Sequence, residues 1–412
     1  MKTLGKAAVV AALTVGASAA AAPLKAEPPP IAVYWVSAST TSGFMAGMMG
    51  QGGRPSMGSM VGMMMRGGPD PNAAQHNLRL QLGSQRAPKG EPQAEHDAPA
   101  ALNAGPVFPL VTPRAAPPEE EAPQPPEQYR KPQGRMLIYW GCGEHAGPGQ
   151  PVVIDFAKMA DAPQRYAGLM RGLPIAQMRP PSPGRSTTYG EWPNDRSRIT
   201  IPANSSLVGS HVVQGNYSPE IRFTLSPQQD FMAPLRLTSN QPTPTGSVRL
   251  AWQPVPSTTG YFASVMGAQG RRGGDDATMV MWTSSAVQAA AFMAPDYIAP
   301  AEARRLVAEH VLLSPETTTC LVPQEVAHAA AQGMLSMTAY GEEANFGFPA
   351  RPAPPIWVAK VRYRSATSAL LGQADPMQGD NRQRGRRRDE PDGEGSGGTG
   401  RSILHGLGGL IP

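Results

Sequence analysis

The chain has 412 residues, of which 46 are Pro and 45 are Gly, whereas only 16% are charged. Proline and glycine therefore make up more than a fifth of the chain, and this composition predicts that long segments stay outside any packed core. The formal charge of +5 is too small to indicate a nucleic-acid-binding protein, so no nucleic-acid partner is expected.

The first 22 residues are typical of a secretory signal peptide. Lys2 and Lys6 precede an apolar run at residues 7–16, and small residues that suit cleavage follow at 17–22. The run is too short to span a bilayer of about 30 Å, and no later run reaches the roughly 18 apolar residues of a membrane helix. We expect a periplasmic, secreted or cell-surface protein with no transmembrane span after signal cleavage. An uncleaved N-terminal anchor is the alternative.

Two strands are predicted within residues 23–84. Residues 31–39 are rich in β-branched and aromatic side chains, and residues 77–82 alternate polar and apolar side chains with the period of a half-buried strand. Between the two strands lies a loop of residues 43–68 that is rich in glycine and methionine. It contains the pattern Met-x-Gly-Met-Met twice.

This loop is the first candidate binding site. Thioether sulfur is a soft ligand that prefers Cu(I), and several of these methionines have the spacing Met-x-x-Met on a glycine-rich chain that can wrap around an ion. The alternative is that the methionines fill irregular apolar gaps, or form a linker that binds nothing. The candidate Cu(I) ligands are Met45, Met48, Met49, Met57, Met60, Met63, Met64 and Met65.

A Pro-rich stretch follows, and residues 85–134 are predicted to be a disordered linker. Its apolar segment at 107–111 is the part expected to contact the folded domain. Residues 135–195 are expected to hold two further strands, at 136–142 and 150–156, and then an irregular region.

Residues 196–368 give the clearest indication of fold. Short apolar strands separated by turn residues are typical of an antiparallel β-sandwich. A helix is predicted at 300–311, because a proline near its start and a glutamate in its first turn favour a helix N-terminus. A second short helix is predicted at 323–332. The predicted strands are residues 197–201, 211–213, 220–225, 235–237, 247–252, 260–266, 278–282, 334–340 and 356–363.

One part of this domain resembles a known family. In residues 248–261 a strand ends in Trp252, a Pro-Val pair and a short turn follow, and Gly260 and Tyr261 open the next strand. This pattern resembles the second and third strands of a fibronectin type III domain. The resemblance implies a fibronectin/Ig-like sandwich in which Trp252 fills the space between two sheets. It implies no particular activity. The whole chain also resembles a type of secreted protein of Gram-negative bacteria.

The two cysteines, Cys142 and Cys320, leave two interpretations open. In an exported protein they can form one disulfide, which closes a long loop and stabilises the fold by roughly 4–5 kcal/mol in the chain-entropy model. The alternative is two buried thiols that never meet. Glu144 and His145 lie near Cys142, but a strand end followed by a turn explains this cluster better than a catalytic cysteine with its base.

No catalytic motif is visible in the chain, which lacks a metalloprotease histidine pattern, a Cys-x-x-Cys pair, a nucleophile elbow and a P-loop. We therefore expect no enzymatic activity. Residues 369–412 are predicted to be a disordered, basic and glycine-rich tail. Its arginine cluster at 382–388 can contact an anionic surface, and a solvated tail without a partner is the alternative.

These observations predict a mainly β protein: an antiparallel fibronectin/Ig-like sandwich with one or two inserted helices and long disordered segments. The expected function is that of an exported, non-enzymatic envelope protein, a binding or structural module without a cofactor. Its partner would be an envelope protein, a polymer or an anionic surface. The alternative is a periplasmic Cu(I)-binding protein that uses the methionine-rich loop.

Overall fold

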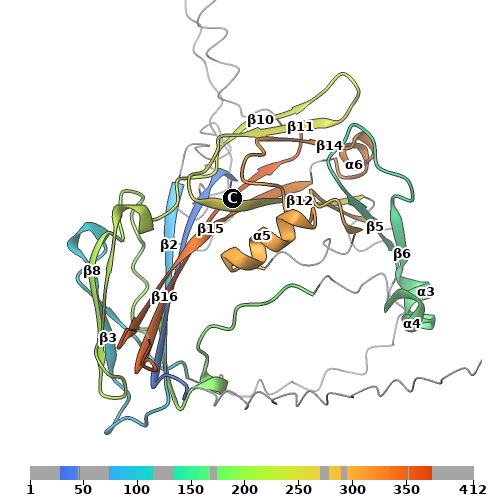
Figure 1. Ribbon diagram of the computed structural model, residues 1–412. Coiled ribbons are helices and arrows are strands. Elements are labelled where there is room, and N and C mark those ends of the chain that lie inside the picture. Colours follow the sequence, from blue (N-terminus) through green and yellow to red (C-terminus); the bar gives the residue numbers. More distant parts are fainter. Residues whose placement is uncertain are drawn as a thin grey trace, which may run out of the picture.

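The computed structural model describes residues 28–44, 46, 74–114, 133–167, 174–269, 278–288, 295–331, 333–350 and 352–373. Within these residues the protein is mainly β, and a bent nine-stranded sheet is its largest element (Figure 1). In sheet order, its strands are β6 (Val152–Asp155), β5 (Arg135–Trp140), β13 (Thr278–Thr283), β12 (Thr258–Gln269), β15 (Met334–Phe348), β16 (Trp357–Leu370), β1 (Ala32–Ser42), β2 (Ala74–Ser84) and β7 (Thr188–Trp192).

Neighbouring strands of this sheet are antiparallel except at two places. β5 is parallel to β13, and β1 is parallel to β16 along residues 32–42 and 357–367. β2 pairs with the other side of β1 along its whole length. Strands from the predicted segments 23–84, 135–195 and 196–368 therefore share one hydrogen-bonded sheet.

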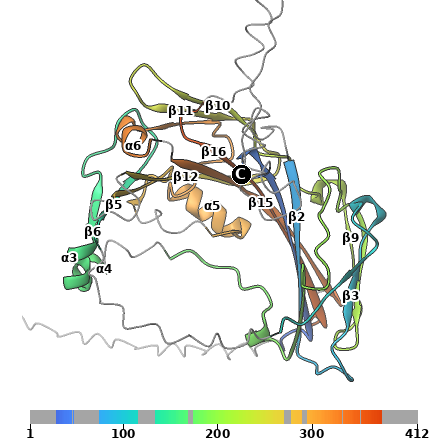
Figure 2. The ribbon, with the colours of Figure 1, turned by 180° about the vertical axis from the view of Figure 1, so that it is seen from behind.

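Two smaller sheets cover the convex face of the bent sheet (Figures 1 and 2). Apolar side chains join the layers in one core: the rings of Trp252 and Tyr261 are 5.4 Å apart, and those of Phe223 and Phe346 are 5.1 Å apart. One small sheet has the order β10 (Leu237–Pro242), β11 (Val248–Trp252) and β14 (Thr319–Val322). The other has the order β4 (Val107–Pro109), β3 (Ala94–Asp97), β8 (Gly209–Gly215) and β9 (Ile221–Leu225).

The concave face carries the helix α5 (Pro300–Ala308), which corresponds to the helix predicted at 300–311. Figure 1 shows α5 beneath β12 and β15. Its buried residues Ala303 and Leu306 belong to a small apolar cluster with Phe262 of β12 and Tyr340 of β15. The helix leaves the rest of the concave face, along β16, β1 and β2, uncovered by helices within the described residues.

The remaining helical segments are short. α6 (Gln324–Ala329) lies within the second predicted helix, and α3 (Phe156–Asp161) begins where the Asp155 side chain accepts a hydrogen bond from the backbone N–H of Lys158. None of the helices in the described residues is long and apolar enough to cross a membrane. The others are α4 (Pro163–Ala167) and the 3-10 turns η1 (Ala100–Leu102), η2 (Pro183–Arg185) and η3 (Pro227–Gln229).

The prediction of a disordered linker at 85–134 is wrong for residues 85–114, which are folded. β3, η1 and β4 form there, because Leu102 and Phe108 are fully buried and anchor the segment to the core. Residues 115–132, the predicted signal peptide and most of the predicted tail lie outside the described residues. The start of that tail, residues 369–373, completes β16 and a turn.

The strand predicted at 197–201 is also absent from the structure. Its residues make only isolated bridges, from Ser197 to Asn194 and from Ile201 to His76. The strand of this region is β7 instead, which pairs with β2 and buries Tyr189 and Trp192. Those two aromatic side chains bury more apolar surface than the isoleucines of 197–201, and Ile199 remains 43% exposed.

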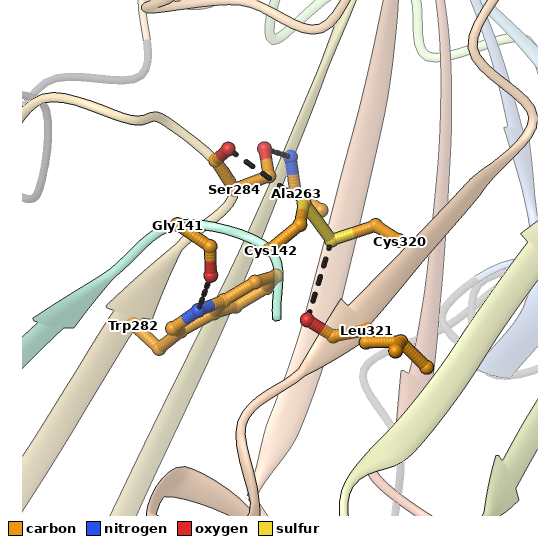
Figure 3. Close-up of a disulfide and its surroundings, with 7 residues drawn as sticks. All are labelled: Gly141, Cys142, Ala263, Trp282, Ser284, Cys320 and Leu321. Carbon is orange, nitrogen blue, oxygen red and sulfur yellow. Dashed lines mark hydrogen bonds between the residues drawn. A yellow bond between two sulfur atoms is a disulfide. The ribbon is translucent and has the colours of Figure 1, made fainter. Parts of the chain in front are cut away.

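A disulfide joins Cys142, which follows β5, to Cys320 of β14, with their Cα atoms 5.3 Å apart (Figure 3). The bond links the nine-stranded sheet to the three-stranded sheet. Nearby, the Trp282 Nε1–H donates a 2.9 Å hydrogen bond to the Gly141 carbonyl oxygen. Both cysteines are therefore part of the fold, and Cys142 has no free thiol for the catalytic role considered from the sequence.

Candidate functional site

A cleft of about 950 Å³ lies against β16, β1 and β2. Its other walls come from residues 111–114, from residues 191–196 and 198–201 at the end of β7 and beyond it, and from Asp296 and Tyr297. We call it the arginine cleft, because six arginines and only three carboxylates line it. These charged residues are Arg79, Arg114, Arg196, Arg198, Arg362 and Arg364, with Glu191, Asp195 and Asp296.

Strand register brings these distant residues together. Side chains two residues apart on a strand lie on the same face, so Arg362 and Arg364 share one face of β16. Arg362 lies opposite Ser37 of β1, which in turn lies opposite Arg79 of β2. Arg364 lies opposite Ser39 in the next row. The two serines are buried between the longer side chains, and the arginines form the polar surface of the sheet.

Three of the six arginines are paired with carboxylates. Within the described part of the chain, no carboxylate lies within ion-pair distance of the other three, which are Arg114, Arg196 and Arg362. The lining therefore keeps an excess of positive charge, and an anionic ligand would be attracted to it. The three ion pairs are Arg79–Glu191 at 2.9 Å, Arg198–Asp195 at 2.9 Å and Arg364–Asp296 at 2.5 Å.

Arg362 is held differently from the exposed arginines at the rim. Its guanidinium carbon lies 4.2 Å from the ring centroid of Tyr297 and 4.9 Å from that of Trp35. Its Nε–H donates a 2.8 Å hydrogen bond to Ser37 Oγ. Burial lowers the pKa of Arg362, although nearby acidic groups favour its charged form, and arginine remains protonated in proteins. The cleft thus contains one partly desolvated cation fixed by two aromatic rings.

His76 also lines the cleft. Its ring stacks on Phe231 with the centroids 4.0 Å apart. Burial lowers the pKa of His76, and the shift is opposed by Asp230 and by a hydrogen bond to the backbone of Ser205. Its Nδ1 atom has no hydrogen-bond partner among the described residues. At neutral pH this side chain is uncharged, so the positive charge of the cleft comes from its arginines.

A second group of polar, titratable side chains lies in the core between sheets. Tyr34 Oη is 2.7 Å from His96 Nδ1, His96 Nε2 is 2.9 Å from His211 Nδ1, and His211 Nε2 is 2.7 Å from the Leu207 carbonyl oxygen. The Leu207 carbonyl oxygen can only accept a hydrogen bond, so His211 Nε2 carries a proton. The His211 Nδ1 atom is then unprotonated in the neutral ring, and it accepts a hydrogen bond from His96 Nε2–H. His96 Nδ1 then accepts from the Tyr34 hydroxyl. The chain of hydrogen bonds is complete with both histidines neutral.

The eight methionines predicted as Cu(I) ligands all lie outside the described residues. Among the residues that are described, no group of three or more His, Cys, Asp or Glu side chains is placed to hold a metal ion. Cu(I) binding by the methionine loop therefore stays a prediction, and so does the expectation that the chain has no enzymatic activity.

A Cu(I) competition titration tests the methionine prediction. The protein without its predicted signal peptide is compared with a variant in which all eight methionines are changed to leucine, because leucine keeps the apolar volume and removes the sulfur ligands. If the alternative function holds, the protein binds Cu(I) stoichiometrically and the variant does not. Equal binding by both proteins, or binding by neither, contradicts the prediction.

Neither group of side chains is marked by a clear pattern in the sequence. The arginine cleft combines single residues from segments up to 325 positions apart, as for Ser37 and Arg362, so no local motif encodes it. The period-two pattern of Lys360, Arg362 and Arg364 within a strand was its one visible signal. His96 and His211 are isolated in the sequence. No known family model, curated protein or solved structure matches the chain.

Proposed function

We propose that this protein is an exported, non-enzymatic binding module of the cell envelope, which holds an anionic ligand in the arginine cleft. The observation that carries the proposal is the imbalance of charge in the cleft, with six arginines against three carboxylates. A volume of about 950 Å³ lies within the range of about 300–1,000 Å³ that is usual for small-molecule sites. It accommodates a small acid or a few units of an acidic polymer.

The proposed location rests on two features. The N-terminal residues are typical of a secretory signal peptide, and the disulfide between Cys142 and Cys320 suits an oxidising compartment such as the periplasm or the exterior of the cell. Both features favour a periplasmic, secreted or cell-surface protein, and the resemblance of the whole chain implies a Gram-negative bacterium as its source.

We also propose that the fibronectin type III-like sandwich predicted for residues 196–368 is formed by the described strands β10 to β16. In support, the three-stranded sheet β10-β11-β14 covers the neighbouring strands β13, β12, β15 and β16 of the nine-stranded sheet. The Trp252 side chain is buried between these layers against Tyr261, which is the role that the resemblance implies for it. α5 is then an insertion between β13 and β14. The strands β1, β2 and β7 extend the sandwich on the side that carries the arginine cleft.

Binding to charged and neutral polysaccharides tests the proposed function. We expect the mature protein to bind polygalacturonate and dextran sulfate, and not neutral dextran, with an affinity that falls as salt is raised. Changing the exposed rim residues Arg114→Gln and Arg196→Gln together should weaken binding about threefold to tenfold at low salt, in line with the small effect of single exposed charges. Biolayer interferometry at two salt concentrations measures both effects.

A charge-matched control separates the cleft from net charge. Arg165 of α4 and Arg249 of β11 are exposed residues outside the cleft. The double variant Arg165→Gln and Arg249→Gln removes the same two charges, and it should bind both acidic polymers like the wild type. Equal weakening by the two double variants would show binding by overall charge alone, and absence of binding to every acidic probe, polymer or small acid, would contradict the proposed function.

A further inference from the structure

Arg362 is the arginine of the cleft on which this inference rests. Arg79 and Arg364, its neighbours on the same face of the sheet, are paired with Glu191 and Asp296. Lys360, two residues before it on β16, forms an ion pair with Glu343. Among these neighbouring cations of the described sheet, Arg362 alone has no carboxylate at ion-pair distance.

The hydrogen bonds of Arg362 leave one edge of its guanidinium available. Nε–H donates to Ser37 Oγ, so the inner edge is used within the protein. No other described residue forms a hydrogen bond with its terminal atoms Nη1 and Nη2. Because Arg362 lines the cleft, a ligand there can accept two parallel N–H···O bonds from the two terminal nitrogens.

The aromatic neighbours fix the orientation of this edge. Tyr297 and Trp35 both lie within 5 Å of the guanidinium carbon, and Trp35 is itself only 8% exposed. Stacking of this kind restricts the rotation of the planar guanidinium, so little conformational freedom remains to be lost when a ligand binds.

We propose that Arg362 anchors a carboxylate group of the ligand through Nη1 and Nη2, and that Tyr297 positions the guanidinium for this contact. The inference rests on the proposed function, since it names the chemistry of the ligand in the same cleft. A carboxylate matches the planar two-donor edge of arginine. It also carries a single negative charge, which matches a site where the adjacent arginines are already neutralised. The carboxylate belongs to a free organic acid or to an acidic unit of a polymer.

Calorimetry with galacturonate, its uncharged methyl ester and polygalacturonate tests the anchor and identifies the source of the carboxylate. We expect galacturonate to bind and the ester to bind at least tenfold more weakly, because esterification removes the charge and one acceptor. Binding of the polymer without the monomer assigns the site to a polymer. Binding of the ester as tightly as of the acid overturns the carboxylate assignment.

Two substitutions of the anchor define its role. Arg362→Gln removes the charge, and Arg362→Lys keeps the charge but loses the two-donor edge. Both variants should bind the carboxylate probe at least tenfold more weakly than the wild type, as is usual for hydrogen bonds to charged groups. Arg249→Lys outside the cleft should bind normally. Carboxylate binding that is unchanged in Arg362→Lys overturns the two-donor contact.

A third variant leaves every charged residue in place, and it tests the same contact if the arginine substitutions disturb the fold. Tyr297→Leu removes one of the stacking rings, and it should weaken galacturonate binding while near-UV circular dichroism stays native outside the lost tyrosine signal. Wild-type binding by this variant overturns the positioning role of Tyr297.

If the wild type binds dextran sulfate in the cleft but neither carboxylate probe, the anchor fails and the proposed function stands. If it binds no acidic probe, both fail.

Discussion

Replacement of Cys142 and Cys320 by alanine should lower the free energy of unfolding by about 5 kcal/mol in the chain-entropy model, since the disulfide closes a loop with a sequence separation of 178. This is a large part of the roughly 5–15 kcal/mol that is usual for folded domains. The bond also joins two sheets, because Cys142 follows β5 and Cys320 lies in β14. We therefore expect a marked loss of stability and not a local change.

Chemical denaturation at pH 7 measures this loss. Alanine is preferred to serine, because Cys320 is only 4% exposed and a buried hydroxyl would add its own cost. Reduction of the wild type should lower its denaturation midpoint to nearly that of the double variant, and the reductant should leave the double variant unchanged. A midpoint of the double variant equal to that of the oxidised wild type contradicts this role of the disulfide.

Acid should destabilise the fold through the chain of Tyr34, His96 and His211. Burial lowers the pKa of both histidines, that of His96 well below its usual range. The unfolded chain takes up these protons near the usual histidine pKa of about 6.5, whereas the folded chain does not. Above that pH the two histidines are neutral in both the folded and the unfolded state, and the fold has its full free energy of unfolding. This free energy decreases as the pH falls from there toward the folded-state pKa values, by at most about 1.4 kcal/mol per pH unit for each histidine.

Urea unfolding between pH 7.5 and 4.5 measures this dependence. The double variant His96→Gln and His211→Gln should be less stable at pH 7.5, because the hydrogen bonds are disturbed, but its stability should fall less steeply below pH 6.5. The control His328→Gln changes an exposed histidine and should leave the wild-type dependence intact. If the wild type and the double variant depend on pH equally, the buried pair is not the cause.

The long strands were predictable from the sequence because their apolar pattern is local. The segment 31–39 became β1 and the segment 77–82 became β2, each with a few more residues. β3, β4 and β7 were missed for a physical reason. They are held by a few fully buried side chains such as Phe108 and Trp192, within segments that contain proline and short polar residues. Tertiary burial outweighs weak local preference there.

The arginine cleft could not be predicted, because its charge balance depends on pairing between strands. The sequence shows Arg79, Arg362 and Arg364 as ordinary charges of alternating strands. Only the register of β16, β1 and β2 makes them neighbours. Glu191 and Asp296 pair with Arg79 and Arg364, so that among these three strand arginines Arg362 alone has no carboxylate partner in the described residues. Cysteine pairing was left open from the sequence for the same reason, since the two residues meet through the arrangement of β5 and β14.

The parallel pairing of β1 with β16 also determines when the protein can fold. A ribosome must synthesise the chain through residue 370 before β16 can fill the gap between β1 and β15. A shorter nascent chain would present two long unpaired strand edges, which are prone to aggregation. Contacts between residues so distant in sequence also form slowly. This delay leaves the growing chain without its central strand pairs until late in synthesis, which suits the export proposed above, because a chain passes through a narrow translocation pore unfolded.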